Sequence, residues 1–181
     1  IGQRALFIAQ PGGGVLWDCT PLLTDEAIAQ IGVLGGLRAI AISHPHYYAS
    51  MVDWSRAFGG VPIYIHADDA AHITRPDPAI VIWQGETHDL GQGLTIVRLG
   101  GHFAGGSVLH WAGGQQGRGA LLSGDIVTVV PDTRYVSFMY SYPNLIPLPA
   151  RKVRDMAARL EPYPFERVYG AWWDRVCRQD G

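Results

Sequence analysis

Apolar positions along the chain follow two periods, and each period predicts a different kind of element. Short apolar runs bounded by glycine predict β-strands. Apolar residues three and four positions apart predict helices. We expect strands over Gln3–Ala9, Gly14–Cys19, Leu37–Ser43, Val61–Ala67, Ile80–Trp83, Leu94–Gly100, Ser107–Ala112, Ala120–Gly124 and Arg167–Gly170. We expect helices over Thr24–Leu34, Ser50–Phe58 and Ala150–Leu160, and a short helix from Asp68 to about Thr74.

The order of these elements indicates the fold class. Strands and helices alternate at first, several strands then follow in succession, and a helix and a strand close the series. This order predicts a mixed α/β layered domain and does not fit a purely alternating, doubly wound sheet. The segment Val130–Pro149 carries four prolines, and we expect a long loop there, of the kind that often carries function.

Polar residues at two expected helix starts are suited to capping. Thr24 precedes the first helix, and a threonine hydroxyl there accepts a backbone N–H of the first turn. Ser50 and Asp53 have the spacing of a capping box, in which both side chains bind backbone N–H groups. We therefore expect Thr24 and Ser50 to be the capping residues.

Composition narrows the class of protein. The 181 residues point to one domain, and 48% hydrophobic with 17% charged residues excludes a disordered chain. No apolar run approaches the ~18 residues of a membrane span. The net charge of −2 does not indicate binding to nucleic acid or to anionic lipid. Cys19 and Cys177 form no metal-binding pair, so we expect buried thiols in a reducing, cytoplasmic compartment. The chain begins at Ile1, so missing terminal segments stay an open alternative.

Four polar residues follow the ends of expected strands. They are His44, His46, His102 and Asp125. Sites in layered α/β folds gather at such edges, and two histidines two positions apart project to one side of an extended chain. Three imidazoles with an open position form a catalytic zinc arrangement, in which bound water has a pKa near ~7 and a carboxylate can deprotonate it. Turn residues that bind only their own backbone are the structural alternative for His102 and Asp125.

Three motifs occur in the order and rough spacing of a known family. They read ISHPH over Ile42–His46, GGHFAGG over Gly100–Gly106 and LLSGD over Leu121–Asp125. In this respect the chain resembles the metallo-β-lactamase superfamily. The resemblance implies a four-layer αββα sandwich that forms a single domain over residues 1–181. It also implies hydrolysis of an ester, thioester, amide or phosphodiester with one or two metal ions, usually zinc.

The chain departs from the family pattern at the second metal site. Tyr48 stands where the family has aspartate, and Ala49 stands where it has histidine. The late histidine of the family corresponds to Ala171 or Trp172 here. Only the bridging carboxylate, Asp125, remains of the second site, so the resemblance implies one metal ion per chain.

Three functional hypotheses follow. The first is a hydrolase of a small-molecule ester, thioester or amide, with Zn²⁺ on His44, His46 and His102, Asp125 as fourth ligand or base, and Tyr48 as a hydrogen-bond donor. The second is an Fe²⁺ oxygenase, because His44, His102 and Asp125 form a two-histidine, one-carboxylate set. The third is a non-catalytic member of the fold, because a fold alone does not guarantee chemistry.

Further residues are candidates for the surroundings of the site. Asp53 could reach toward the vacated second metal position, although its capping role is the simpler interpretation. The segment that holds Tyr140, Tyr142 and Asn144 is a candidate for the site mouth, with a solvent loop as the alternative. Trp54, Trp172 and Trp173 are candidates for a pocket wall, with core packing as the alternative.

Overall fold

Two β-sheets pack face to face in the computed structural model, which describes residues 2–141 and 146–178. The first sheet has the strand order β1-β2-β3-β4-β5 and the second has the order β15-β14-β9-β8-β7-β6. The strands of the first sheet are β1 (Leu6–Ile8), β2 (Gly14–Trp17), β3 (Leu37–Ala41), β4 (Ile63–His66) and β5 (Ile80–Trp83). The strands of the second are β6 (Thr87–Gly91), β7 (Leu94–Arg98), β8 (Ser107–Trp111), β9 (Ala120–Gly124), β14 (Arg167–Gly170) and β15 (Val176–Cys177).

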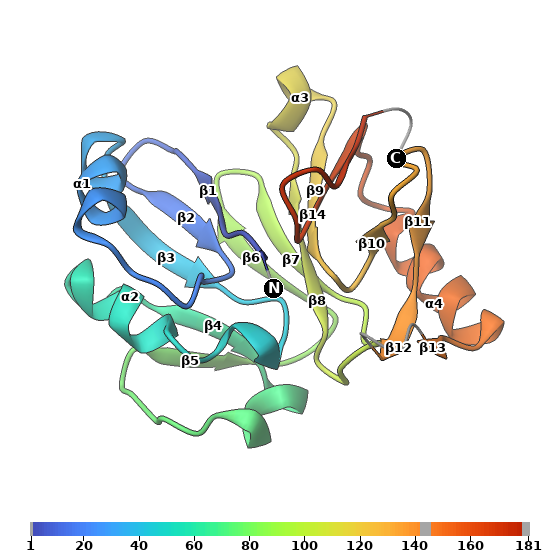
Figure 1. Cartoon of the computed structure of the whole chain (residues 1–181), viewed down its shortest axis with the longest axis horizontal. Helices are drawn as coiled ribbons and strands as arrows, with labels where there is room; N and C mark the ends of the chain where they lie inside the picture. The colour runs from blue at the N-terminus through green and yellow to red at the C-terminus, as the bar shows by residue number, and fades with distance from the viewer. Residues whose placement is uncertain (1, 142–145, 179–181) are drawn as a thin grey trace.

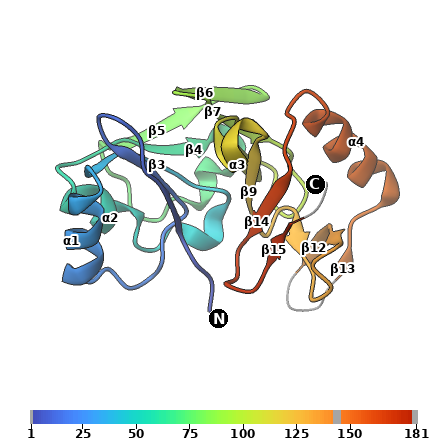
Figure 2. The same cartoon turned by 90° about the horizontal axis from the view of Figure 1, so that it is seen from above.

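Helices cover the outer face of each sheet. Helices α1 (Asp25–Val33) and α2 (Met51–Ala57) lie against the first sheet, and α4 (Ala150–Leu160) lies against the second (Figure 1). Figure 2 shows the same order of helix, sheet, sheet and helix from above. This arrangement is the four-layer αββα sandwich expected from the sequence. The short elements are α3 (Gly114–Gly117), the 3₁₀ turns η1 (Pro45–Tyr47) and η2 (Ala67–His72), and two hairpins, β10–β11 (Thr128–Val129, Val136–Ser137) and β12–β13 (Met139–Ser141, Ile146–Pro147).

Three apolar clusters fill the spaces between the four layers. Alternate residues of one strand face different clusters, because successive side chains of a strand point to opposite faces. Val15 and Trp17 of β2 pack between the two sheets, whereas Leu16 packs toward α1 and α2. In α4, Met156 and Leu160 pack on the outer face of the second sheet. The burial of both faces of each sheet explains why the central strands are continuous apolar runs.

Some local predictions are wrong for physical reasons. Ser50 makes no capping hydrogen bond, and its hydroxyl donates instead to the carbonyl of Thr20 at 2.7 Å. The capping box is therefore absent, whereas Thr24 accepts the N–H of Ala27 as expected. Strands β6 and β15 were not expected, nor were β10 to β13, of which β11, β12 and β13 lie in the segment Val130–Pro149 that was expected to be a loop. Strand β6 (Thr87–Gly91) is a polar edge strand whose only buried residue is Leu90, so it lacks the apolar alternation that marks a strand.

The parallel strands of the two sheets bring several strand ends to one edge. In the first sheet β2 and β3 are parallel, so the residues after Trp17 and after Ala41 emerge together. In the second sheet β9 and β14 are parallel, and Gly124 is paired with Gly170. The backbone N–H of Ser107 donates to the carbonyl of Ser43 at 2.9 Å, which joins the two sheets at this edge.

Candidate metal centre

The histidines and the carboxylate expected from the sequence meet at this edge. One nitrogen or oxygen atom from each of His44, His46, His102 and Asp125 lies within 4.8 Å of all the others. His44 and His46 follow β3, His102 follows β7, and Asp125 follows β9. Strand ends from both sheets therefore build the cluster.

Asp18 fixes the backbone just before the first histidine. Its carboxylate Oδ1 accepts the N–H of Ser43 at 2.7 Å, and its own N–H donates to the carbonyl of Ala41 at 2.9 Å. Asp18 has a φ of 62°, a left-handed conformation that aspartate adopts more readily than most residues. The chain after β2 is thus turned so that a buried carboxylate holds the start of the His44 segment.

Glycine is required where β9 approaches the same segment. Gly124 has a φ of +53°, and a Cβ there would lie 2.8 Å from the hydroxyl of Ser43 and 3.3 Å from Asp18 Oδ2. A side chain at this position would collide with residues that hold the first histidine. The glycine of the LLSGD motif therefore lets Asp125 come close to His44.

His44 is fully buried and sits at the centre of the cluster. Its Nδ1 lies 2.8 Å from the Ser43 hydroxyl, and its Nε2 lies 3.1 Å from His46 Nδ1 and 3.1 Å from Asp125 Oδ1. In the tautomer whose Nδ1–H donates to Ser43, the Nε2 lone pair is free to bind a metal ion.

His102 is prepared in the same way from the other sheet. Its Nδ1 lies 2.7 Å from the backbone carbonyl of Tyr140, which can only accept, so Nδ1 carries the proton and donates. The other ring nitrogen, Nε2, is buried and has no hydrogen-bond partner among the described residues. A buried lone pair without a partner costs free energy, and a bound metal ion would satisfy it.

Asp125 contributes the second orphaned atom of the cluster. Its Oδ1 is buried and accepts no hydrogen bond of good geometry within the described part of the chain, although His44 Nε2 lies 3.1 Å away. Its segment is fixed by Thr128, whose hydroxyl donates to the Asp125 carbonyl at 2.8 Å. The Asp125 carboxylate is thus held beside the histidines with an oxygen lone pair available to bind a metal ion.

The surroundings of the cluster oppose protonation of His44 and His46. Burial lowers the pKa of His44 well below its usual value, and His46 and His102 lower it further. Burial also lowers the pKa of His46, with His102 as the second cause. Burial raises the pKa of Asp125, and His102 opposes that shift. Neutral imidazoles are the form that binds metal ions, so the cluster favours a cation over protons at neutral pH.

The donor set fits a metal ion. Nitrogen ligands at ~2.0–2.1 Å from zinc are about 3.4 Å apart at the tetrahedral angle, close to the 3.1 Å between His44 Nε2 and His46 Nδ1. His44 and Asp125 close the buried side, and His46 is exposed. The cluster therefore has the chemistry of an open metal site, and it could hold zinc or iron.

The positions that the resemblance assigns to a second metal site carry Tyr48, Ala49 and Ala171, and none of them belongs to the ligand cluster of the described residues. Tyr48 and Ala49 follow η1, and Ala171 follows Gly170, which is paired with Gly124 beside Asp125. Asp53 does not reach this space, because it is half exposed and pairs with Arg75 at 2.8 Å. The described residues around Asp125 thus offer a single metal position.

Two consecutive tyrosines, Tyr47 and Tyr48, follow His46 in the chain and have different surroundings. The ring of Tyr47 meets that of His44 edge to face, with centroids 5.3 Å apart, and its buried hydroxyl has no hydrogen-bond partner among the described residues. Burial raises the pKa of Tyr47, with Asp18 and Asp125 as further causes. For Tyr48 burial is again the main cause of a raised pKa, but the carboxylates that add to it are Asp69 and Asp18. The catalytic role expected for Tyr48 stays a prediction.

Asp18 lies beside the site, bound to Ser43, although no motif of the sequence selects it. The expected strand Gly14–Cys19 ran past Asp18, whereas β2 ends at Trp17, so that Asp18 directly follows a strand as Asp125 does. Burial raises its pKa to about 8, and the hydrogen bonds from Ser43 act in the opposite direction. Asp18 shares no motif with the histidines, which is why spacing alone did not select it.

The residues proposed from the sequence for the pocket wall and the site mouth lie in different places. Trp54 is a core residue whose indole N–H donates to the Thr20 carbonyl, and Trp173 is exposed. Trp172 lines a cavity of about 450 Å³ together with Met139 and Thr128. Tyr140 reaches the site through its backbone carbonyl. Tyr142 and Asn144 lie outside the described residues.

Solved structures of low sequence identity share this architecture. The DIM-1 metallo-β-lactamase matches 98% of this chain and 81% of its own chain, with a TM-score of 0.71 and 15% identity. TTHA1623 in a di-iron-bound form matches 94% and 87%, with a TM-score of 0.64 and 20% identity. A quorum-quenching N-acyl homoserine lactone lactonase matches 91% and 77%, with a TM-score of 0.62 and 17% identity. The chain has the metallo-β-lactamase fold, with a histidine and aspartate cluster at the edge where its strands end.

A bacterial relative is much closer in sequence. The chain is 55% identical over 172 residues to the uncharacterized protein YmaE of Bacillus subtilis (strain 168). The alignment covers 95% of this chain and 62% of the relative, so the chain spans less than two thirds of that protein's length. No family model matches the chain. None of the helices in the described part of the chain has the length and hydropathy needed to cross a lipid bilayer.

Proposed function

We propose that this chain is a metal-dependent hydrolase that binds one zinc ion on His44, His46 and His102, with Asp125 as the fourth ligand or as the base. The observation that carries the proposal is the convergence of four ligand atoms within 4.8 Å, two of which, His102 Nε2 and Asp125 Oδ1, are buried and unsatisfied among the described residues. Such orphaned atoms are rare in folded proteins unless a water or an ion satisfies them. The convergence of two such atoms with two further ligand atoms supports a metal site over a set of turn residues.

The residues around the site would have different roles in hydrolysis. A zinc ion bound there would act as a Lewis acid and bring the pKa of its water to about 7. Ser43 and the Tyr140 carbonyl orient the two imidazoles, and Asp125 is the carboxylate within reach to accept a proton. The exposed side at His46 is where a substrate would approach.

Ester and amide carbonyl groups are the substrate class that we propose. The support comes from the names of two structural neighbours, a metallo-β-lactamase and an N-acyl homoserine lactone lactonase, which denote cyclic amides and cyclic esters.

The test is hydrolysis by the zinc-loaded chain of a panel of lactones, thioesters, linear esters and β-lactams. We expect turnover of at least one class, which a chelator abolishes and zinc restores. His102→Ala should lose it, whereas His88→Ala, at a histidine on the edge strand β6, should keep it. Turnover that is insensitive to the chelator, or none in the whole panel, would contradict the proposal.

Iron is the second candidate metal, because TTHA1623 is described in a di-iron-bound form and His44, His102 and Asp125 form a facial set. The same preparation loaded with Fe²⁺ and placed in an oxygen electrode distinguishes the two. Oxygen consumption that depends on a thiol or other reductant substrate would favour the oxygenase, and hydrolysis with zinc alone would favour the hydrolase.

A further inference from the structure

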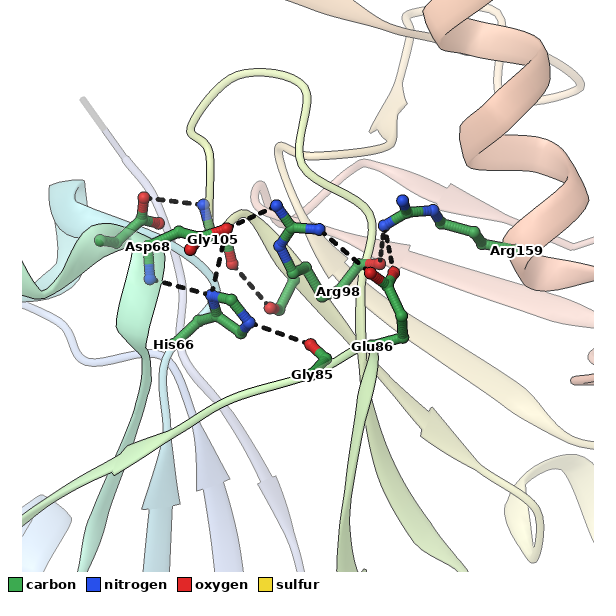
Figure 3. A network of polar contacts seen from close by, with 9 residues as sticks. His66, Asp68, Gly85, Glu86, Arg98, Gly105 and Arg159 are labelled. Carbon is green, nitrogen blue, oxygen red and sulfur yellow. Dashed lines mark hydrogen bonds and ion pairs between the residues drawn. The ribbon is translucent and has the colours of Figure 1, made fainter.

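A buried carboxylate outside the metal cluster reaches the loop that carries His102. Asp69 belongs to η2, which follows β4 of the first sheet, and only 1% of the residue is exposed. Gly105 belongs to the loop between β7 and β8 of the second sheet. The Gly105 N–H donates to Asp69 Oδ1 at 2.8 Å, which is part of the network drawn in Figure 3. The contact crosses from one sheet to the ligand-bearing loop of the other.

The fit at Gly105 is tight on the side of Asp69. A Cβ at Gly105 would lie 2.8 Å from Asp69 Cγ and 3.0 Å from His66 Cβ. On its other side the Gly105 carbonyl accepts the hydroxyl of Ser107 at 2.8 Å. Both backbone groups of Gly105 are therefore held by side chains, and only glycine can occupy the position without a shift.

The hydrogen bond at Gly105 also restrains His102, because the loop between β7 and β8 is short and has backbone hydrogen bonds across it. The N–H of Gly100 donates to the Gly106 carbonyl at 2.8 Å, and the N–H of Gly106 donates to the Phe103 carbonyl at 3.1 Å. His102 lies between these bonds, three residues before Gly105. A loop tied at Gly105 leaves the His102 backbone little freedom, which matters for a ligand that must be placed within a few tenths of an ångström.

The turn that presents Asp69 is itself fixed. His66 Nε2 donates to the Gly85 carbonyl at 3.0 Å, and His66 Nδ1 accepts the N–H of Asp68 at 3.1 Å. Asp68 also pairs with Arg98, which continues to Glu86 and Arg159 along the surface (Figure 3). Exposed pairs of this kind contribute little each, whereas the buried bond of Asp69 loses a charged acceptor if it is removed.

We propose that Asp69 is a positioning residue for the metal site: its hydrogen bond to Gly105 holds the loop so that His102 Nε2 meets the other ligands. The inference rests on the proposed function, since it requires that the cluster binds a metal ion. Asp69 acts through the loop backbone and touches neither the metal position nor a substrate.

The experiment is a titration of the metal-free chain with Co²⁺, followed by its visible absorption, and with Zn²⁺ in competition. Asp69→Ala should weaken metal binding by about 10–100-fold, the usual effect of losing an outer partner of a ligand, and should change the Co²⁺ spectrum. Asp69→Asn, which keeps an acceptor oxygen, should recover most of the affinity. Asp68→Ala is the matched control in the same turn and should bind like the parent.

A coupling measurement separates positioning from general loss of structure. If Asp69 acts through its contact with Gly105, the effects of Asp69→Ala and Gly105→Ala on metal affinity should not add, and the double variant should bind Co²⁺ no more weakly than the weaker single variant. Additive effects of the two substitutions would overturn the proposal, as would parental affinity and spectrum in Asp69→Ala. Should Asp69→Ala fail to fold, Gly105→Ala presses on the same contact and should weaken binding, and parental binding by that variant would overturn the proposal. A parent chain that binds no metal would refute the proposed function itself, whereas a binding parent with an unaffected Asp69→Ala would refute only the role of Asp69.

Discussion

His44 and His102 each use one ring nitrogen to bind the protein and keep the other for a ligand. The partners are the Ser43 hydroxyl at 2.8 Å and the Tyr140 carbonyl at 2.7 Å. Such partners fix both the tautomer and the ring orientation, which lowers the cost of assembling a metal site. The histidines themselves were predictable because they follow strand ends, but their partners come from segments with no sequence signal that connects them.

Removal of the Ser43 hydroxyl tests this preparation directly. Ser43→Ala leaves His44 Nδ1 without its partner, and we expect zinc affinity to fall by about 10–100-fold. Ser55→Ala is the matched control, because Ser55 is also buried but lies in α2 and donates to the carbonyl of Val61, which precedes β4. Competition titration with a chromophoric chelator measures both. Equal affinities for the two variants would contradict the role of Ser43.

Asp18 predicts a pH dependence of stability in the metal-free chain. Its pKa is raised from 3.8 to about 8 by burial, so the folded state holds this proton over a range in which the unfolded state has released it. Stability therefore falls as pH rises between about 4 and 8, since the folded state binds more protons there. Asp18→Asn, which is neutral and keeps an acceptor for Ser43, should flatten that slope.

Urea unfolding of the two chains in the presence of a chelator, from about pH 5 to pH 8, measures the difference. The parent should lose stability relative to Asp18→Asn as pH rises. Parallel pH profiles for the two chains would show that Asp18 releases its proton in the folded state as easily as in the unfolded state.

At the scale of elements, the sequence predicts those segments whose pattern is decided locally. The central strands and α4 are predicted well because an apolar run or an apolar helix face is a local signal. The capping box at Ser50 failed because a residue distant in sequence, Thr20, offers the hydroxyl a carbonyl at 2.7 Å. Asp69 and Gly105 were missed for the same reason, since 36 residues separate them in the chain.

The two helix starts give a stability test of this distinction. Thr24→Ala should destabilise the chain by about 1 kcal/mol, because the hydroxyl caps α1 through the Ala27 N–H. Asp53→Ala should change stability by less than about 0.5 kcal/mol, because the residue is half exposed and only pairs with Arg75. Urea unfolding measures both. A larger loss of stability in Asp53→Ala than in Thr24→Ala would contradict this account and indicate that Asp53 caps α2.

At the scale of the whole molecule, the fold brings the candidate ligands together, and the residue types at this edge determine how many metal ions can bind. Parallel strands in both sheets bring their ends to one edge, and the segments after β3, β7 and β9 supply the ligands. The resemblance assigns Tyr48, Ala49 and Ala171 to a second metal site, and none of the three belongs to the ligand cluster of the described residues. The fold class followed from element order and motifs, whereas one metal ion per chain stays a prediction from these three positions.

The most direct test is the metal content of the chain after reconstitution with zinc and removal of unbound ions, measured by inductively coupled plasma mass spectrometry. We predict one zinc ion per chain, retained in His88→Ala and lost in His102→Ala with the metal-free fold intact by circular dichroism. Two ions per chain would show a second site that the described residues do not form. No bound metal in the parent would contradict the account, because the buried lone pairs of His102 and Asp125 would then serve no ion.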